Sequence, residues 1–596
     1  MRSRKRRLIA LGLLCPAAGF TLAAGWSAHL GLSVRGHLQA TEDALVRLRA
    51  SDPAGAAGSL ADAQRHAEEA RRLTNGQDWA LIGRIPPVED GATTVRGLAA
   101  AAADLTGVLR DVHGVVAKLI TVKGLSMDNV ETLPASLESA TPVLRDAARR
   151  IELIRSRLAA TPADTGLDAL DQARATALRE LDQLQGWLAV ANDAAVNDTA
   201  ALLPEMLGYH GQRRYFLAFQ TNAEARGTGG LVGAFGILKA DRGHLSIERL
   251  SSNNDLVGGS VQVADHGPDF RGRYGPSATS LMSNSNLSPH FPYAAKTWTA
   301  LWERQTGERL DGAIATDPVA LSHLLKVIGP VTLPSGEKVT AENVVDLTER
   351  EAYVRYPDPL ARKKYLIAIA STVSKAITQS HPDPLALISA LSQMVDERRI
   401  QIWSRRNSEQ RRLAATPLGG VLPQKPGPFA GLLVINSAGT KLDYYLDRSL
   451  HYELGPCRSD GMRATKVRIQ LSNNVPEGNL PKYVADRLDY PKDPRPVGSN
   501  LLWVSFYAAV GAKADALHVD GRPAKLIKQF ERSHPVYSSV LDFNPKQSRT
   551  LEFNLTEPYS PAPPVAPVQP LVRPQQTRIT QDNRGCPTGP SVRNAG

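Results

Sequence analysis

The sequence has little cysteine and lacks the short motifs that mark several enzyme chemistries. Its 596 residues include three cysteines, Cys15, Cys457 and Cys586, which excludes a disulfide-dense scaffold and any zinc module with four cysteine ligands. There is no G-x-S-x-G nucleophile elbow and no P-loop, and no two histidines stand four residues apart on a helical face. The sequence therefore predicts no catalytic residue, no metal ligand and no cofactor.

The excess of positive over negative charge is small beyond the N-terminus. The chain has 70 Lys and Arg against 59 Asp and Glu, a net charge of +11, and five of the basic residues stand among the first seven. The remaining excess is 11 − 5 = +6, and no basic stripe interleaved with aromatics accompanies it, so nucleic acid is not an expected partner. A hydrophobic content of 42% is enough for folded cores and excludes a wholly disordered chain.

One long apolar run is present, from Leu8 to Ala28, directly after a basic block. Because about 20 helical residues cross a bilayer and basic residues stay in the cytoplasm, residues 1–30 are predicted to form a cytoplasmic start and a transmembrane anchor. This predicts a single-pass protein of the cell membrane whose bulk is extracytoplasmic. A cleaved signal peptide ending near Thr21-Leu22-Ala23 is the alternative. Cys15 is then an apolar residue of the span.

Cys457 and Cys586 are the two thiols beyond this run. An oxidising compartment would allow them to form a disulfide, and two free cysteines are the alternative.

The rest of the chain divides by its hydrophobic pattern. Residues 31–200 repeat apolar residues at spacings of three and four, which predicts an amphipathic helical bundle. Residues 203–420 interleave strand-like runs with helical patterns such as Pro318 to Ile328, which predicts an α/β domain. Residues 427–557 predict a small antiparallel β domain, and the proline-rich residues 558–596 predict a disordered tail. Apolar residues of the bundle pattern include Leu98, Ala102, Leu105, Leu109, Val112 and Val116.

The first segment with candidate chemistry runs from Phe219 to Gly236. Asn222, Glu224 and Arg226 follow a strand, and a glycine cluster then leads into the next strand. Small residues allow a ligand or another strand to approach the backbone closely. The alternative is a turn between tightly packed strands.

The second segment runs from Tyr353 to Lys364. Asp358 is placed to cap a helix beginning near Pro359, and Arg355 and Arg362 flank it. Guanidinium groups around a helix start suit an anionic ligand, because the arginine fork matches phosphate oxygens. An N-cap beside a solvated basic face is the alternative.

Two stretches of the sequence resemble a known family. Tyr215 to Asp255, with its Phe-Gln-Thr-Asn-Ala-Glu-Ala-Arg-Gly-Thr-Gly-Gly-Leu-Val-Gly motif, and Asp311 to Arg362 are similar to the membrane-anchored bacterial family called domain of unknown function 4012. The segment from Trp79 to Pro87 fits the same family. The family has no established activity.

The α/β part also resembles, more faintly, the LytR–CpsA–Psr phosphotransferases, which move a glycopolymer from a polyprenyl-pyrophosphate carrier to peptidoglycan. By that resemblance Arg226 matches the arginine of the first loop, Ser252 and Asp255 fall near a Ser/Asp segment, and Arg355, Asp358 and Arg362 match an Arg…Asp…Arg element. The acidic residue expected soon after Arg226 is replaced by Gly227, Thr228 and Gly229, and no arginine precedes Asp255. These departures remove a metal ligand and a basic clamp on which phosphoryl transfer depends.

The leading interpretation is a cell-envelope protein whose α/β domain binds an anionic ligand, such as a polyprenyl-phosphate-linked lipid or a cell-wall glycopolymer. The ligand-binding set it predicts comprises Arg226, Arg355, Arg362, Asp358, Asp255 and Asn222. One alternative is a Mg²⁺-dependent phosphotransferase that attaches glycopolymer to the cell wall. Another is a non-catalytic structural protein that binds an envelope protein partner.

Overall fold

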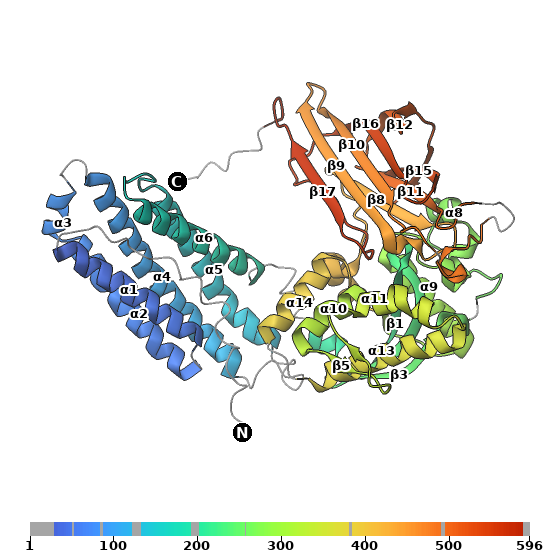
Figure 1. Ribbon diagram of the computed structural model, residues 1–596, viewed down its shortest axis with the longest axis horizontal. Helices are drawn as coiled ribbons and strands as arrows, with labels where there is room; N and C mark the ends of the chain where they lie inside the picture. Colours follow the sequence, from blue (N-terminus) through green and yellow to red (C-terminus); the bar gives the residue numbers. More distant parts are fainter. Residues whose placement is uncertain are drawn as a thin grey trace. The chain divides into compact units, whose positions relative to one another are not determined.

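The computed structural model describes residues 29–50, 53–83, 88–121, 133–191, 202–256, 258–380, 384–478, 480–489 and 495–587 (Figure 1). The chain forms two compact units. One comprises Met1–His210 with Asp383–Ala386, and the other comprises Gly211–Pro382 with Leu387–Gly596.

The first unit is built from amphipathic helices whose apolar faces share one core. Leu98, Ala102 and Leu105 are each 2% exposed or less, as their three- and four-residue spacing predicts. Trp79 is fully buried and donates a hydrogen bond from its indole nitrogen to the carbonyl oxygen of Ala92. The helices are α1 (His29–Ala50), α2 (Pro53–Thr74), α3 (Gln77–Ile82), α4 (Glu89–Thr121), α5 (Leu133–Ala159) and α6 (Asp168–Ala191).

The second unit begins with a five-stranded mixed sheet in the order β3-β2-β1-β4-β7. Strands β1, β2 and β3 form an antiparallel meander, β4 lies parallel to β1, and β7 is antiparallel to β4. The crossover from β1 to β4 makes this an α/β layer rather than a simple hairpin sheet. The strands are β1 (Arg213–Arg226), β2 (Gly229–Asp241), β3 (His244–Ser252), β4 (Gly312–Thr316) and β7 (Gln401–Ser404).

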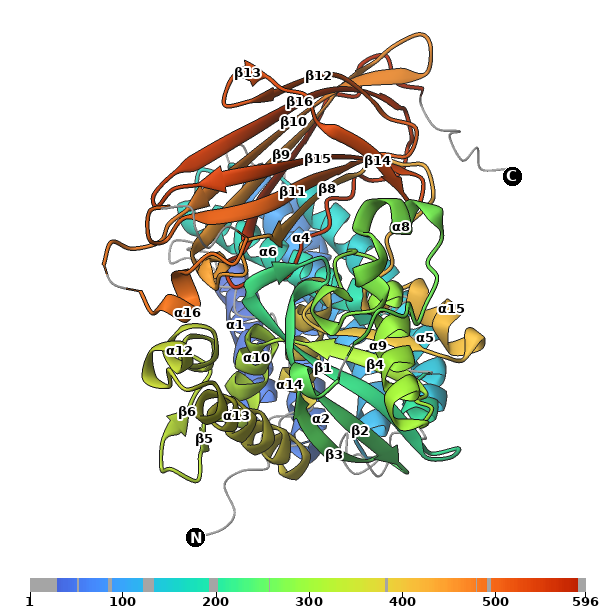
Figure 2. The same ribbon diagram turned by 90° about the vertical axis from the view of Figure 1, so that its right-hand side faces the viewer.

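Helices cover both faces of this sheet (Figure 2). On one face α9 (Phe291–Thr306) packs Trp298 against Phe216 of β1, with ring centroids 5.8 Å apart. On the other face α10 (Pro318–Ile328) contacts β1, and α13 (Pro359–Gln379) contacts β3. The shorter elements are η2 (Asn253–Asp255), α8 (Pro268–Tyr274), η3 (Pro276–Thr279), η4 (Met282–Asn284), β5 (Val331–Thr332), β6 (Lys338–Val339), α11 (Val344–Asp346), the π-helical turn η5 (Leu347–Glu351), α12 (Ala352–Arg355), α14 (Pro384–Asp396), α15 (Asn407–Ala414) and η6 (Pro417–Gly419).

Two further sheets pack face to face around one core in the C-terminal part of the same unit. One has six strands in the order β13-β12-β16-β10-β9-β17, and the other has four in the order β14-β15-β11-β8. Phe506 and Phe553 meet between them with ring centroids 4.5 Å apart. The elements are β8 (Ala430–Asn436), η7 (Leu442–Tyr445), β9 (Leu446–Cys457), β10 (Met462–Asn473), α16 (Lys482–Ala485), β11 (Asn500–Ala508), β12 (Lys513–Val519), β13 (Arg522–Pro523), β14 (Ile527–Glu531), β15 (His534–Phe543), β16 (Ser548–Pro558) and β17 (Gln575–Gln581).

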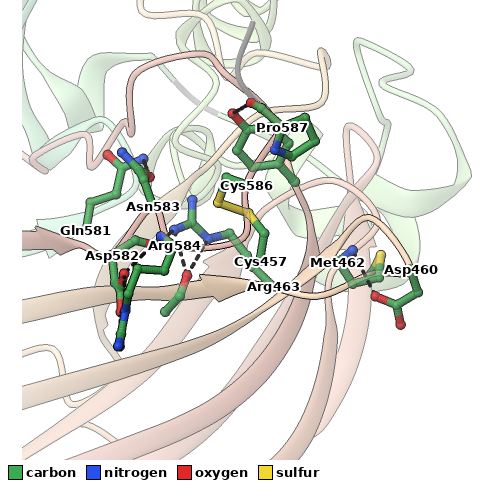
Figure 3. The surroundings of a disulfide bond; sticks show 12 residues. Cys457, Asp460, Met462, Arg463, Gln581, Asp582, Asn583, Arg584, Cys586 and Pro587 are labelled. Atoms are coloured by element: carbon green, nitrogen blue, oxygen red, sulfur yellow. Dashed lines mark hydrogen bonds and ion pairs between the residues drawn. A yellow bond between two sulfur atoms is a disulfide. The ribbon is translucent and has the colours of Figure 1, made fainter.

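The prediction of a disordered tail from residue 558 is wrong for the residues described. Strand β17 pairs in parallel with β9, and Cys586 forms a disulfide with Cys457 at the end of β9 (Figure 3). The buried guanidinium of Arg463 donates to the carbonyl oxygen of Asp582 at 2.9 Å beside this bond. Main-chain pairing and a covalent link therefore order a segment whose composition offers few apolar residues. Disulfides of this kind persist in oxidising compartments.

The prediction of a membrane-spanning helix is corrected by the structure. None of the helices in the described ranges is both long enough and apolar enough to cross a bilayer. Long helices such as α4 carry charged residues, among them Asp104, Arg110 and Asp111, along their length. The predicted span Leu8–Ala28 lies outside the described residues. The single-pass membrane anchor that the sequence predicted, with a cytoplasmic N-terminus and an extracytoplasmic bulk, is not found among the helices described, and the architecture observed is mixed α/β.

Candidate functional site

The end of β1 departs from regular pairing with β2. The register between the two strands shifts between Thr221 and Ala225, so the intervening residues leave the ladder. The N–H groups of Asn222 and Ala223 instead donate to the two carboxylate oxygens of Glu349, at 3.1 and 2.9 Å. The N–H of Ala225 donates to Oδ2 of Asp443 at 2.8 Å. Two buried carboxyl groups from distant segments therefore hold this bulge, because its amides lack strand partners.

The glycine cluster that follows serves close packing of the backbone. A Cβ on Gly230 would lie 2.0 Å from the carbonyl oxygen of Thr221, and one on Gly227 would lie 2.2 Å from that of Leu287. Gly229 adopts a φ of +139°, which side-chain-bearing residues rarely adopt. The cluster thus matches the alternative of a turn between tightly packed strands.

Arg226 is enclosed in a buried ionic group. Its side chain donates to Glu224 Oε1 at 2.9 Å and to the carbonyl oxygens of Ala225 and Ser283, at 2.9 and 3.2 Å. The other Glu224 oxygen accepts from the ammonium of Lys441. Burial raises the pKa of Glu224, but Lys441 and Arg226 outweigh it, so the pKa lies below its ordinary value. Glu224 is therefore a stable carboxylate, and Arg226 has its charge balanced inside the protein.

A cavity of about 610 Å³ lies on the α10/α13 face of the sheet. Strands β1, β2 and β3 form its floor, and α10, α13, η5 and the segment 482–488 complete its walls. Tyr483 and Leu488, which are 53% and 74% exposed, stand where it opens to solvent. Its apolar lining includes Phe219, Leu231, Leu250, Leu321, Leu366, Ile367, Ile369, Ala370 and Leu488. Its charged lining comprises Glu224, Asp317, Glu349, Arg362, Lys363, Lys441, Lys482 and Asp486.

Arg362 stands in the first turn of α13 and is 4% exposed. Its Nη1 donates to the carbonyl oxygens of Tyr356 and Pro357 at 3.0 and 3.2 Å, and its guanidinium carbon lies 4.0 Å from the ring centroid of Tyr483 and 5.2 Å from that of Tyr353. Within the described part of the chain, no hydrogen bond uses Nε or Nη2 and no carboxylate pairs with this arginine. The guanidinium is thus held in place by carbonyls and rings and keeps donors for a ligand.

The other predicted ligand-binding residues have different surroundings. Arg355 is on the surface, paired with Glu337 at 2.6 Å and with Glu351. Asp358 caps α13 by accepting the Ala361 N–H at 2.7 Å, as its position before Pro359 predicts.

Asp255 and Asn222 also have internal partners. Asp255 accepts the N–H of Ser252 at 2.9 Å in a capping box, and Asn222 donates to the carbonyl of Pro570 at 2.8 Å. Of the six predicted residues, the structure brings only Arg362 to the cavity.

Glu349 is a cavity residue that the sequence did not reveal. It sits on the π-helical turn η5, and burial raises the pKa of this carboxyl to about 8 despite the amides of Ala223 and Asn222. Turns of this type are frequent at functional sites. Its contact with Asn222 spans 127 residues of sequence, so no local pattern could have indicated it. Lys441, Lys482 and Tyr483 were missed for the same reason.

No group of three or more His, Cys, Asp or Glu side chains among the described residues is arranged to hold a metal ion. Asp255, which the phosphotransferase resemblance places near a Ser/Asp segment, has its carboxylate engaged in the capping box.

Comparison with known families identifies the central part of the chain. Residues 210–353 match the family described as "Protein of unknown function (DUF4012)". The chain carries a DUF4012 region, as its sequence predicted. The match is narrower than predicted, since it includes Glu224, Arg226 and Glu349 but not the Trp79–Pro87 segment or Arg362. No curated protein and no solved structure matches the chain, and the fainter LytR–CpsA–Psr resemblance is not shown.

Proposed function

We propose that this protein binds an amphipathic anionic molecule in the cavity between the DUF4012 sheet and α13. The observation that carries the proposal is Arg362, a cation excluded from solvent with open donors on the wall of a largely apolar cavity. A buried charge without a carboxylate partner is costly, so an anion supplied by a ligand would offset that cost. Lipid phosphates, including the polyprenyl phosphates suggested by resemblance, belong to this chemical class.

The apolar part of the ligand would lie along α13 and the sheet. Leu366, Ile367 and Ala370 present one apolar stripe of α13 to the cavity, opposite Leu231 and Leu250. A volume of about 610 Å³ falls within the range of about 300–1,000 Å³ usual for small-molecule sites. The cavity therefore suits one hydrocarbon chain with one head group.

The proposal is tested with decyl phosphate, used below its micelle-forming concentration, and the purified full-length chain in a calorimetric titration. Ala370→Phe places a ring inside the cavity, whereas Ser371→Phe places one on the exposed face of the same helix. We expect saturable binding that Ala370→Phe weakens by about tenfold or more, a loss of about 1.4 kcal/mol, and that Ser371→Phe leaves intact. Absence of binding, or equal effects of the two variants, would overturn the proposal.

A further inference from the structure

We propose that the head group of this ligand is a dianion, namely a phosphate monoester, held by Arg362, Lys363 and Lys482. This inference rests on the proposed function and specifies the ligand of the same cavity. The charged groups that line the cavity differ in the internal partners that each of them has.

Two lining carboxylates, Glu224 and Asp317, each belong to a small group of ion pairs, and the net charges of the two groups are opposite. Glu224 is shared by Arg226 and Lys441, which leaves one surplus positive charge. Asp317 pairs with Arg399 at 3.0 Å, and Arg399 also pairs with Glu397 at 3.2 Å. With His323, a further partner of Glu397 at 3.2 Å, counted as neutral, this group has one surplus negative charge. The two surpluses cancel.

Glu349 adds no charge to the lining near neutral pH. Burial raises the pKa of its carboxyl to about 8, so it holds a proton there. The charged groups that face it are Asp317 from the start of α10 and Lys441 from the loop after β8, together with the amides of the β1 bulge.

Three cations and one carboxylate then remain. Arg362, Lys363 and Lys482 form no ion pair with any described residue, and neither does Asp486, which is exposed. The difference, 3 − 1, is an excess of two positive charges on the lining. A phosphate monoester carries about −1.5 to −2 at neutral pH, whereas a carboxylate, a sulfate ester or a phosphodiester carries about −1. The monoester is therefore the head group whose charge matches the site.

Two cations of the lining, Arg362 and Lys441, lie against one ring of the cavity, and Lys363 and Lys482 are sequence neighbours of Arg362 and of the residue that carries this ring. Tyr483 lies beside Lys482, with the Arg362 guanidinium 4.0 Å and the Lys441 ammonium 5.6 Å from its ring centroid. An arginine fork can hold two phosphate oxygens while lysines act as point charges. The apolar stripe of α13 follows Arg362 along the helix. The head group of one molecule would therefore lie at Arg362 and its hydrocarbon chain along the stripe.

The test compares four ligands with the same ten-carbon chain and different heads: decyl phosphate, decyl sulfate, decanoate and decanol. We expect decyl phosphate to bind the full-length chain about tenfold or more tightly than decyl sulfate or decanoate, with decanol weakest. Lys363→Ala and Lys482→Ala should each reduce this preference. Lys364→Ala, an exposed neighbour that does not line the cavity, should leave it unchanged.

The outcomes separate this inference from the proposed function. Equal affinity for decyl phosphate and decyl sulfate, or an unchanged preference in both lysine variants, would overturn the dianion while leaving an anionic ligand in place. Decanol binding as tightly as the charged ligands would overturn the anionic ligand itself. Binding by none of the four would overturn the proposed function together with the inference.

Discussion

Two buried arginines of the second unit, Arg226 and Arg362, differ in what compensates their charge. Arg226 is 7% exposed and pairs with Glu224, while Arg362 is 4% exposed and is held by two carbonyls and two aromatic rings. Burial alone therefore does not identify a ligand-binding arginine. A carboxylate partner makes Arg226 part of the structure, and the lack of one among the described residues leaves Arg362 available to an anion.

The largest effect is expected from Arg226→Leu. It removes one of two cations from Glu224 and leaves the carbonyls of Ala225 and Ser283 without this donor, so unfolding of the second unit should become easier by about 3–5 kcal/mol. Arg362→Leu leaves no carboxylate behind and should cost about half as much or less. Denaturant unfolding of the two variants measures the difference, and equal losses would remove the contrast between the two sites.

Removing the disulfide should lower the stability of the part of the structure that contains Arg226 and should not change ligand binding at Arg362. Cys457 and Cys586 are separated by 129 positions in the sequence, and loss of such a link costs about 2–4 kcal/mol. The tail supports the bulge of β1 because Gln569 donates to the carbonyl of Arg226 at 2.7 Å.

Cys586→Ser should thus lower the unfolding midpoint and expose the tail to limited proteolysis, while decyl phosphate affinity stays unchanged. Cys457→Ser is the matched control and should behave identically. A tail that stays resistant in both variants would show that pairing of β17 with β9 is sufficient by itself.

Glu349, which lines the cavity and holds the β1 bulge, can be examined through the pH dependence of unfolding. Its pKa rises from 4.5 to about 8 on folding, so the protonated form is the one that folding favours. The stability it contributes is complete below about pH 4.5 and is lost as pH rises to about 8, at up to about 1.4 kcal/mol per pH unit.

Glu349→Gln cannot titrate, so its unfolding free energy should fall less steeply over this range. It should also show a constant loss of about 1–3 kcal/mol, since an amide has one acceptor for the N–H groups of Asn222 and Ala223. Asp443, whose pKa burial also raises, retains part of the slope in both proteins. Parallel pH profiles of wild type and variant would contradict the assignment.

Local sequence patterns anticipated the elements of this fold better than its contacts. The helical pattern of Pro318 to Ile328 predicted α10, and the Asp358-Pro359 pair predicted the start of α13, because those signals lie within a few residues. The ion pair of Glu224 with Lys441 joins residues 217 apart, and the pairing of β17 with β9 joins the tail to a strand more than 100 residues earlier. Such partners decide which charged residues are neutralised. For this reason the sequence predicted the same ligand-binding role for Arg226 and Arg362, whereas the fold pairs Arg226 with Glu224 and leaves Arg362 without a carboxylate partner among the described residues.

The smallest effects are expected at the surface end of the second predicted segment. Asp358→Ala removes the cap of α13 and should cost about 1 kcal/mol. Arg355→Ala removes surface ion pairs with Glu337 and Glu351 from a side chain that is 41% exposed, and should change stability by about 0–1 kcal/mol.

Neither residue lines the cavity, so both variants should bind decyl phosphate as wild type does, whereas Arg362→Lys should bind it more weakly because the arginine fork is lost. Calorimetric titration of the three variants shows which of the two arginines that flank Asp358 contributes to ligand binding. Weakened binding by Arg355→Ala would mean that the anion binds at the exposed start of α13 instead of against Arg362. An arginine that already has carboxylate partners would then bind the ligand, and the lack of such a partner would not identify the binding residue.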